Sequence, residues 1–597
     1  MFNVHIIEPH IYLTVDRFVL VMGKLRFLCC LLLALLQGEA VAQHAYPQDY
    51  FRSPLDTTLL LSAPFGQLRD NHFHSGIDIR TFEKEGLPVY AVADGWVARI
   101  KISPFGYGKA IYIDHPNGYT SVYAHLSRLN DSIGNYTKRE QYRKESFDVE
   151  LFPRKNQLQV KKGDLIAYTG NSGGSTGPHL HFELRNTKTE YPINPLLFNL
   201  PVLDTDAPFF KSFTIYNVMP NRPLPILQQK LFPAKTQKIP EGYRFTDTID
   251  LPTGIIGFGV EAFDFITDKE REQNVYTLRM QIDSVPFFRM DMEAFAFSDT
   301  KYINAHIDYE RLIKERVRVQ KCFIDDGNRI DIYQPLPAKG KYWLRDSLTH
   351  TVKFMAKDAS GKSVELHLLI RGKTNDQLSA YYLPECSYDR FVPTRDNVFQ
   401  MYGVRIEVPK GALYDTMDFC IKTLPGNKRT ASKIFKLGDS YTPLHSNVHI
   451  SIKPDKKDTA LFDKMIVGRA FDKGGVGAVG GGYNRGWITA SSRVFGDFAI
   501  LVDTVAPKAT FKNISRDTIC TDTSALKIVI TDNLSGISEY SLRINGKWVL
   551  AEYDAKNDLL MYEYDTNTPR RTKLNVELIV IDRKDNFTRI TKELYLL

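Results

Sequence analysis

The sequence predicts a mainly β protein, in which an antiparallel β domain with the candidate catalytic residues is followed by several β-sandwich modules of immunoglobulin type. Aromatic residues that favour strands are abundant, with 31 Tyr and 36 Phe among 597 residues. Short alternating runs recur between Gly-, Asn- and Asp-containing turns. A linker-like pentapeptide, Asp-Thr-Asp-Ala-Pro at 204–208, recurs as Asp-Thr-Val-Ala-Pro at 503–507, which indicates two related modules.

The length and composition exclude several classes of protein. A single core stops growing near ~250–300 residues, so a chain of this length must hold several domains. With 43% hydrophobic and 24% charged residues and a mean hydropathy of −0.27, the chain is neither wholly disordered, collagen-like nor a polytopic membrane protein. The net charge of +8 suits an acidic envelope polymer but is too small and dispersed to indicate nucleic acid binding.

Residues 1–42 predict a secretory signal peptide whose start is Met22. Two basic residues precede the apolar run 27–36, and small residues follow it before Gln43. Such a run is half the ~20 residues that span a bilayer. We therefore expect an exported protein of the periplasm or cell envelope, or a secreted one, with no stable transmembrane anchor. A retained N-terminal or lipid anchor at Cys29 remains open.

The remaining chain divides at the repeated pentapeptides and at changes in strand pattern. The expected parts are a candidate catalytic domain at 45–200, an enlarged immunoglobulin-like β-sandwich at 204–372, a β-rich middle domain at 375–500 and a C-terminal immunoglobulin-like β-sandwich at 501–597. Four cysteines follow the signal peptide, too widely spaced for a metal knuckle: Cys322, Cys386, Cys420 and Cys520. One or two disulfides and inert buried thiols both remain open.

Polar residues with catalytic potential alternate with apolar residues in one short segment, 179–184. Because side chains of a strand point alternately to its two faces, His179, His181 and Glu183 share one face, and the apolar residues between them face the core. Two imidazoles and a carboxylate therefore lie on one face of the predicted strand.

Two further segments offer similar residues. In 119–126, which follows a Pro-Asn-Gly turn, the same alternation predicts that Tyr119, Tyr123 and His125 lie opposite Val122, Ala124 and Leu126. In 74–79, Asp78 points away from its apolar neighbours, and His74 precedes it across a flexible glycine.

These residues match the needs of a catalytic zinc ion. Such an ion takes three nitrogen or oxygen ligands at ~2.0–2.2 Å and keeps one place open. His74, Asp78 and His181 would supply the ligands, and His125 and His179 would remain free to handle protons. Zinc lowers the pKa of its water towards ~7 and polarises a scissile carbonyl. The pattern differs from His-Glu-x-x-His enzymes, whose motif the chain lacks.

The segment of about residues 60–200 resembles the lysostaphin-type or LytM-like zinc metalloendopeptidases, which cut peptidoglycan peptides. The matching pieces are Phe65-Gly66, His74-Ser75-Gly76-Ile77-Asp78, Pro88 to Gly95, Tyr107-Gly108, Tyr123-Ala124-His125-Leu126-Ser127, Lys162-Gly163-Asp164, Gly170 to Gly173, and Thr176 to Glu183. They follow the family's His-x-x-x-Asp and His-x-His pattern and cover roughly a quarter of the chain.

The resemblance implies an antiparallel β-fold with a groove, zinc on His74, Asp78 and His181, and acid–base or oxyanion roles for His125 and His179. Which of the two histidines is the general base stays open. The implied activity is hydrolysis of peptide bonds in peptidoglycan stem peptides or crosslinks, with the bond undetermined. The alternative is a non-catalytic regulator or wall-binding protein that activates another hydrolase, but all five positions are retained.

Other features near these motifs have two interpretations. His72 could compete with His74 for the ion, whereas His115 belongs to a turn. Glu183 could accept a hydrogen bond from an imidazole that binds the metal ion, or it could form a structural ion pair. The connection 128–161, longer than the family pattern, could flank the groove and contact acidic wall material, or be a solvated helix and loop.

Residues 204–597 contain no convergent catalytic set. We expect this part to hold or target the peptidase, and it could bind an envelope protein.

Overall fold

The computed structural model describes residues 46–219, 223–231, 235–266, 272–378, 389–455, 459–470, 475–515, 519–520, 524–565, 568–569 and 572–596. The described residues from Asp49 onward belong to one compact unit. The signal peptide predicted at 1–42 lies outside the described residues. Among the residues that are described, no helix has both the length and the apolar character needed to cross a membrane.

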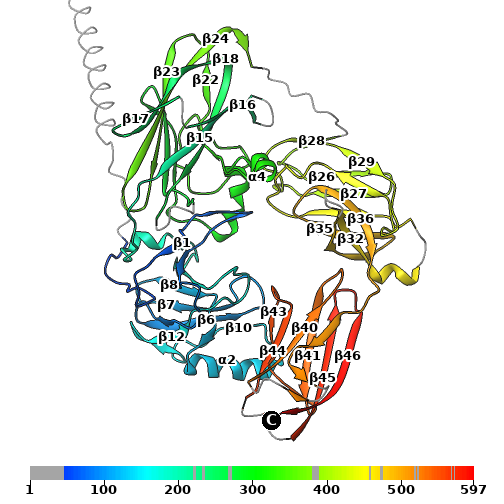
Figure 1. Cartoon of the computed structure of the whole chain (residues 1–597). Helices are drawn as coiled ribbons and strands as arrows, with labels where there is room; N and C mark the ends of the chain where they lie inside the picture. Colours follow the sequence, from blue (N-terminus) through cyan, green and yellow to red (C-terminus); the bar gives the residue numbers. More distant parts are fainter. Residues whose placement is uncertain are drawn as a thin grey trace, which may run out of the picture. The chain divides into compact units, whose positions relative to one another are not determined.

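The candidate catalytic residues lie in and around one antiparallel sheet with the strand order β1-β4-β13-β8-β7-β6-β10 (Figure 1). Its strands are β1 (Leu61–Ala63), β4 (Ile77–Arg80), β13 (His179–Asn186), β8 (Tyr119–Ala124), β7 (Lys109–Asp114), β6 (Gly95–Ile102) and β10 (Val149–Leu151), with β11 (Gln159–Val160) beside β6 and β14 (Pro192–Ile193) beside β13. Smaller sheets are formed by β5 (Pro88–Tyr90), β12 (Leu165–Tyr168) and β9 (Arg128–Leu129), and by β2 (Leu68–Arg69) and β3 (His72–Phe73). A 3-10 helix, η1 (Pro195–Phe198), follows β14.

The register of β13 places the polar residues as the alternation predicts. His181 lies opposite Asp78 of β4 and opposite Ala124 of β8, so these residues share one face of the sheet. Leu180 and Phe182 point to the other face and are fully buried. The polar face is buried as well, since His181 is only 3% exposed.

Within β8 the predicted alternation is confirmed, because Tyr123 and Ala124 point to opposite faces, but the expectation that the face of Tyr123 is the one with the catalytic residues is wrong. Tyr123 lies opposite Phe182 and therefore faces the apolar side of the sheet, where it is fully buried, whereas Ala124 shares the face of His181. Strand β8 ends at Ala124, and His125 adopts a left-handed backbone with φ of +58°. This turn of the backbone, and not strand alternation, brings the His125 side chain to the site.

The core beneath the first strands continues into the following segment. Phe65 and Phe73 lie in the same hydrophobic cluster as residues of 204–372, and their rings are 4.7 Å and 5.9 Å from that of Phe295. The side-chain amide of Asn274 also donates to the carbonyl of Gly66 at 2.9 Å. The backbone that leads into His74 is thus held by packing from outside the catalytic sheet.

Residues 209–377 form a sheet with the order β16-β15-β18-β24-β23-β19-β20. Its elements are β15 (Phe209–Asn217), β16 (Leu224–Lys230), β17 (Thr236–Ile239), β18 (Gly242–Phe263), β19 (Thr277–Ile282), β20 (Val285–Asp291), η2 (Phe297–Tyr302), α3 (Ile303–His306), α4 (Tyr309–Glu315), β21 (Gln320–Lys321), β22 (Tyr342–Leu344), β23 (Thr349–Lys357) and β24 (Ser363–Gln377). Strands β17, β21 and β22 pair with β18 off the main path.

Residues 389–502 place two sheets around one apolar cluster, which is a sandwich arrangement. One sheet is β26 (Asn397–Met401), β27 (Val404–Val408), β31 (Val448–Ile452), β35 (Trp487–Ser492) and β34 (Gly482–Asn484); the other is β29 (Ile421–Leu424), β30 (Ile434–Leu437), β36 (Gly496–Val502), β32 (Met465–Ala470) and β33 (Val476–Gly480). A small sheet pairs β25 (Asp389–Phe391) with β28 (Met417–Phe419), and η3 spans Thr459–Lys464. Cys322 has a buried free thiol, whereas Cys420 is disulfide-bonded.

Residues 508–596 form another pair of sheets around a separate apolar cluster. The sheets are β37 (Lys508–Phe511), β40 (Ala525–Thr531), β44 (Leu559–Glu563) and β43 (Glu552–Asp554), and β38 (Ile514–Ser515), β39 (Ile519–Cys520), β46 (Phe587–Leu596), β45 (Thr572–Asp582), β41 (Ile537–Ile544) and β42 (Lys547–Trp548). The mainly β fold is confirmed, and the immunoglobulin type of these modules remains a prediction.

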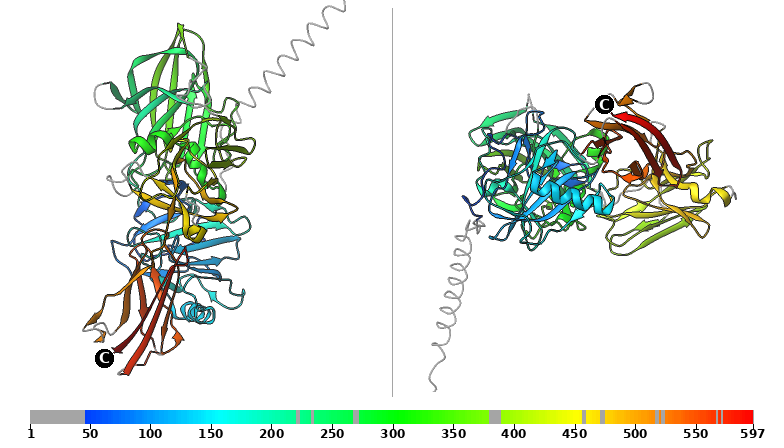
Figure 2. Two further views of the ribbon diagram at one scale, coloured as in Figure 1. Left: turned by 90° about the vertical axis from the view of Figure 1, so that its right-hand side faces the viewer. Right: turned by 90° about the horizontal axis from the view of Figure 1, so that it is seen from below.

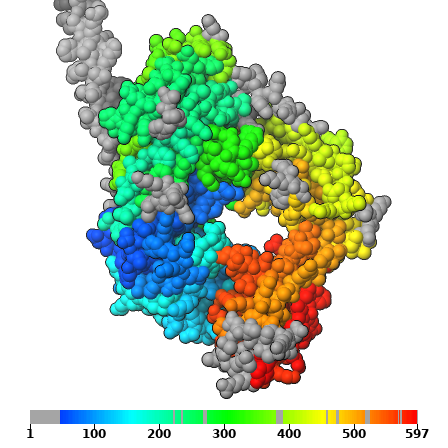
Figure 3. Space-filling model, viewed as in Figure 1, coloured from blue at the N-terminus to red at the C-terminus, as the bar shows by residue number. Residues whose placement is uncertain are grey.

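The long connection after β9 contains helix α2 (Asp131–Lys144), whose first turn is capped by the Asn130 side chain. The helix is not merely solvated. The ring of Tyr142 lies 5.3 Å from that of Trp548, and Lys138 pairs with Asp565 at 2.9 Å. Two side chains of the helix thus contact residues of 508–596, and Lys138 is neutralised within the chain. Figures 2 and 3 give further views of the same chain.

Candidate metal centre

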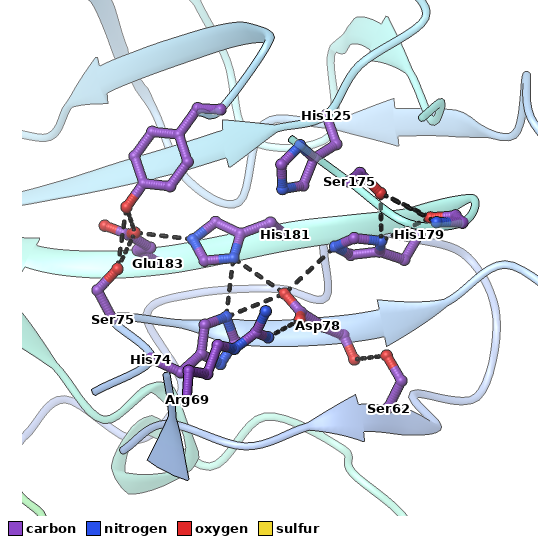
Figure 4. A network of polar contacts seen from close by, with 12 residues as sticks. Ser62, Arg69, His74, Ser75, Asp78, His125, Ser175, His179, His181 and Glu183 are labelled. Carbon is purple, nitrogen blue, oxygen red and sulfur yellow. Dashed lines mark hydrogen bonds and ion pairs between the residues drawn. The ribbon is translucent and has the colours of Figure 1, made fainter. Parts of the chain in front are cut away.

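Three ligand atoms converge at the edge of β4 and β13. His74 Nε2 lies 3.0 Å from Asp78 Oδ1 and 3.0 Å from His181 Nδ1, and the last two atoms are 2.9 Å apart. Figure 4 shows the three side chains pointing toward one another. The three atoms form a nearly equilateral triangle, and each of the three residues is at most 5% exposed.

This triangle fits a zinc ion. Ligand atoms at ~2.0–2.1 Å from a tetrahedral ion are ~3.3 Å apart, which is close to the observed separations. Two imidazoles and one carboxylate are also a donor set that zinc accepts while a fourth place stays open. The three residues are close enough to one another to hold one metal ion, as the sequence predicts.

In each ligand side chain, a hydrogen bond or ion pair to one polar atom determines which other atom faces the candidate metal site. His74 Nδ1 donates to the Pro64 carbonyl at 2.8 Å, which leaves Nε2 for the ion. Asp78 Oδ2 pairs with Arg69, which leaves Oδ1. His181 Nε2 lies 2.7 Å from a Glu183 oxygen, which leaves Nδ1. The fold therefore orients all three ligands before any ion binds.

His125 and His179 lie beside the triangle without belonging to it. His125 Nδ1 donates to the Ser172 carbonyl at 2.9 Å, and His179 Nδ1 donates to the Gly177 carbonyl at 2.9 Å. A carbonyl oxygen only accepts, so the other nitrogen of each ring, Nε2, carries the lone pair in the neutral form. The two ring centroids are 4.8 Å apart, and His179 Nε2 lies 3.4 Å from Asp78 Oδ1.

Burial and neighbouring charges shift the pKa values of these groups in opposite directions. Burial lowers the pKa of His125 to about 3, and the charges of His181 and His179 add to the effect. Burial also lowers the pKa of His74. For His181 burial opposes ionisation, but Asp78 and Glu183 raise its pKa to about 9. His125 is therefore neutral near pH 7 and can accept a proton.

The other histidines near the motifs have no role in the triangle. His72 is exposed and bonds only weakly to its own turn, with Nδ1 3.3 Å from the Asp70 carbonyl. His115 is buried and is satisfied by the Asp94 carbonyl and the Ser121 hydroxyl, each at 2.8 Å. Neither residue belongs to the cluster of potential ligands.

Sequence reasoning missed Arg69 and the loop 171–178. Arg69 comes from β2, which pairs with β3 and lies outside the sheet of Asp78, and its guanidinium pairs with the Asp78 carboxylate. The loop contributes backbone carbonyls, which a residue of any type could supply. The matching pieces Gly170 to Gly173 and Thr176 to Glu183 pointed to this loop, but not to its carbonyl contacts.

A glycine between the two ligands of the first motif allows the strands to approach. A Cβ on Gly76 would lie 2.4 Å from the Phe182 carbonyl oxygen and 2.8 Å from Glu183 Cγ. We expect Gly76→Ala to lower the free energy of unfolding by about 1–3 kcal/mol through overpacking, measured by denaturant unfolding. Gly177→Ala, whose Cβ would meet nothing within 4 Å, should change it little, and equal effects of the two variants would contradict this account.

Comparisons with known proteins confirm the predicted resemblance. The model of Peptidase family M23 matches residues 72–142 and 149–195, and that of a Zu5-like domain matches 389–503. DD-carboxypeptidase/endopeptidase Mpg of Neisseria meningitidis serogroup B is 36% identical over 146 residues, 24% of this chain and 27% of that protein. Peptidoglycan DD-endopeptidase ShyB of Vibrio cholerae is 32% identical over 131 residues, 22% of this chain and 24% of that protein.

Among solved structures, a zinc containing peptidase from Vibrio cholerae is 26% identical, with a TM-score of 0.19; the match covers 25% of this chain and 39% of that one. The chain spans about a quarter of the length of the curated relatives named above. The Peptidase family M23 match includes all five histidine and aspartate positions described above.

Proposed function

We propose that the protein is an exported zinc metalloendopeptidase that hydrolyses peptide bonds in peptidoglycan stem peptides or crosslinks, because its residues 72–142 and 149–195 match the model of Peptidase family M23. The observation that carries the proposal is the triangle of His74, Asp78 and His181 with two unligated histidines beside it. The retention of all five side chains favours an enzyme over a regulator that has lost its ligands.

His74 Nε2, Asp78 Oδ1 and His181 Nδ1 would hold the zinc ion. When bound, zinc supplies Lewis acidity, which activates water near neutral pH and polarises the scissile carbonyl. His125 and His179 lie side by side next to the ligand triangle, where one, as a neutral ring, can accept the proton of the attacking water at Nε2, and the other can donate from Nε2 to the developing oxyanion when its ring is protonated at both nitrogens. Burial keeps the His125 ring neutral before the reaction, which leaves its Nε2 lone pair free, but a pKa of about 3 makes the ring a weak proton acceptor and does not select it over His179 as the base.

The substrate and location rest on the relatives and on the sequence. Both curated relatives named above carry an endopeptidase name, and that of ShyB specifies peptidoglycan. A secretory signal at 1–42 would bring this chain to the envelope, and its net charge of +8 suits an acidic polymer.

Digestion of purified peptidoglycan by the full chain tests the proposal. Mass spectrometry of the released muropeptides should show crosslinked dimers converted to monomers, with the new ends identifying the bond that is cut. A chelator should stop the conversion and added zinc should restore it. Unchanged muropeptides in the presence of zinc would contradict the proposed activity.

Zinc binding should release a proton from His181. Its pKa of about 9 means that the ring is protonated at pH 7 without the ion, whereas His74 is neutral because its pKa is lowered. Zinc must displace the proton on His181 Nδ1, so zinc affinity should rise about tenfold per pH unit below pH 9 and level off above it. Calorimetry in buffers of different ionisation enthalpy should show about one proton released at pH 7, and an affinity independent of pH would contradict this assignment.

A further inference from the structure

We propose that Glu183 is a positioning residue, which holds the proton of His181 on Nε2 and so presents Nδ1 to the metal ion. The inference rests on the proposed zinc site and concerns a residue that does not itself touch the ion. Of the two interpretations that the sequence left open for Glu183, both contacts are present: Oε1 is the partner of His181, and Oε2 forms the ion pair with Arg185.

The surroundings of Glu183 consist of hydrogen-bond donors. The side chain is fully buried, and its Oε1 lies 2.7 Å from His181 Nε2 and 2.7 Å from the Ser75 hydroxyl, with the Tyr107 hydroxyl also in contact. An ionised carboxylate can only accept hydrogen bonds. His181 Nε2 must therefore carry a proton, and when the ring is neutral its lone pair is on Nδ1, the atom that faces Asp78 and His74.

The ion pair of Glu183 uses its other oxygen. Arg185 Nε donates to Oε2 at 2.6 Å, and the guanidinium also lies over the ring of Tyr112 at 5.5 Å. Arg185 thus balances the buried charge without competing for Oε1. With the Arg185 guanidinium on Oε2 and only hydrogen-bond donors around Oε1, the surroundings fit an ionised carboxylate that accepts from His181.

The network also restrains the ring itself. Tyr107, which donates to Glu183 Oε1, places its ring 5.0 Å from that of His181, and the Tyr107 carbonyl accepts from the backbone N–H of His125 at 3.0 Å. Ser75 belongs to the His-Ser-Gly-Ile-Asp run between two ligands. Residues from three parts of the sheet therefore fix the position of one carboxylate oxygen, as positioning of a metal ligand requires.

Zinc affinity of Glu183→Gln in the full chain tests this role. The variant keeps the shape of the side chain but loses the charge that holds the proton, so the dissociation constant for zinc, measured by competition with a chromophoric chelator, should rise ~10–100-fold. Glu150→Gln is the matched control, because Glu150 lies in the same sheet and pairs with Arg99, away from the centre. Its zinc affinity should equal that of the wild type. A Glu183→Gln protein that binds zinc as the wild type does would overturn the inference.

A second measurement needs no variant and therefore does not depend on Glu183→Gln folding. In the zinc-loaded wild type with nitrogen-15-labelled histidine, two-bond proton–nitrogen correlations report which ring nitrogen carries the proton. We expect His181 to be protonated at Nε2, and protonation at Nδ1 would overturn the inference. Both readouts are independent of wall digestion: if the peptidoglycan assay fails while zinc affinity still depends on Glu183, the proposed substrate is wrong and the positioning role stands.

Discussion

His181→Ala should abolish peptidoglycan hydrolysis and remove zinc from the protein. The side chain supplies one corner of the ligand triangle and is buried between Asp78 and Glu183, so no neighbouring side chain can replace it without a rearrangement of β13. Lewis acidity contributes several kcal/mol to catalysis, and each ~1.4 kcal/mol is a factor of ten, so the rate of muropeptide release should fall at least ~10³-fold.

His72→Ala is the matched control for this variant. His72 precedes the first ligand by two residues but is exposed and outside the triangle. Zinc content by mass spectrometry and the rate of muropeptide release should both remain at the wild-type level. Retained zinc together with retained cleavage in His181→Ala would refute the ligand assignment, and loss of zinc in His72→Ala would show that the wrong histidine was chosen.

His125→Ala and His179→Ala should separate catalysis from metal binding. Neither ring belongs to the ligand triangle, and Nδ1 of each ring donates to a carbonyl of the loop 171–178. Both variants should therefore keep the zinc ion bound to the triangle. Proton transfer by a positioned side chain contributes about 10²–10⁴-fold, and each variant should lose turnover in that range with little change in KM.

The two variants should also differ in their response to pH. If His125 is the base, its removal should leave a rate that rises with hydroxide concentration, because solvent must then take the proton. Removal of the oxyanion donor should lower the rate without this dependence. Zinc loss in either variant, or turnover within twofold of the wild type, would contradict the roles assigned to these histidines.

The sequence contained enough to predict a strand that carries His179, His181 and Glu183 on one face. The alternation in 179–184 follows from strand geometry, and the pairing of β13 with β4 brings His181 opposite Asp78, whereas His74 precedes β4. The aromatic content and the turn pattern likewise predicted a mainly β protein, and the repeated pentapeptide precedes strands at both of its positions.

The sequence could not predict the features of the site that depend on backbone atoms, nor the contacts between residues far apart in the chain. His125 reaches the site through a left-handed backbone beyond the end of β8, which the period of two cannot describe. The carbonyls that orient His74, His125 and His179 have no residue signature. The contact of α2 with Trp548 joins residues about 400 positions apart, and one sequence without an alignment carries no information about such pairs.

Anomalous diffraction at the zinc absorption edge from crystals of the zinc-loaded protein tests the central claim most directly. The account predicts one strong peak in this domain, ~2.0–2.2 Å from His74 Nε2, Asp78 Oδ1 and His181 Nδ1. The nearest atoms of His125 and His179 should remain outside coordination distance. A peak bound by other residues, or the three ligand side chains pointing apart with no peak between them, would contradict it.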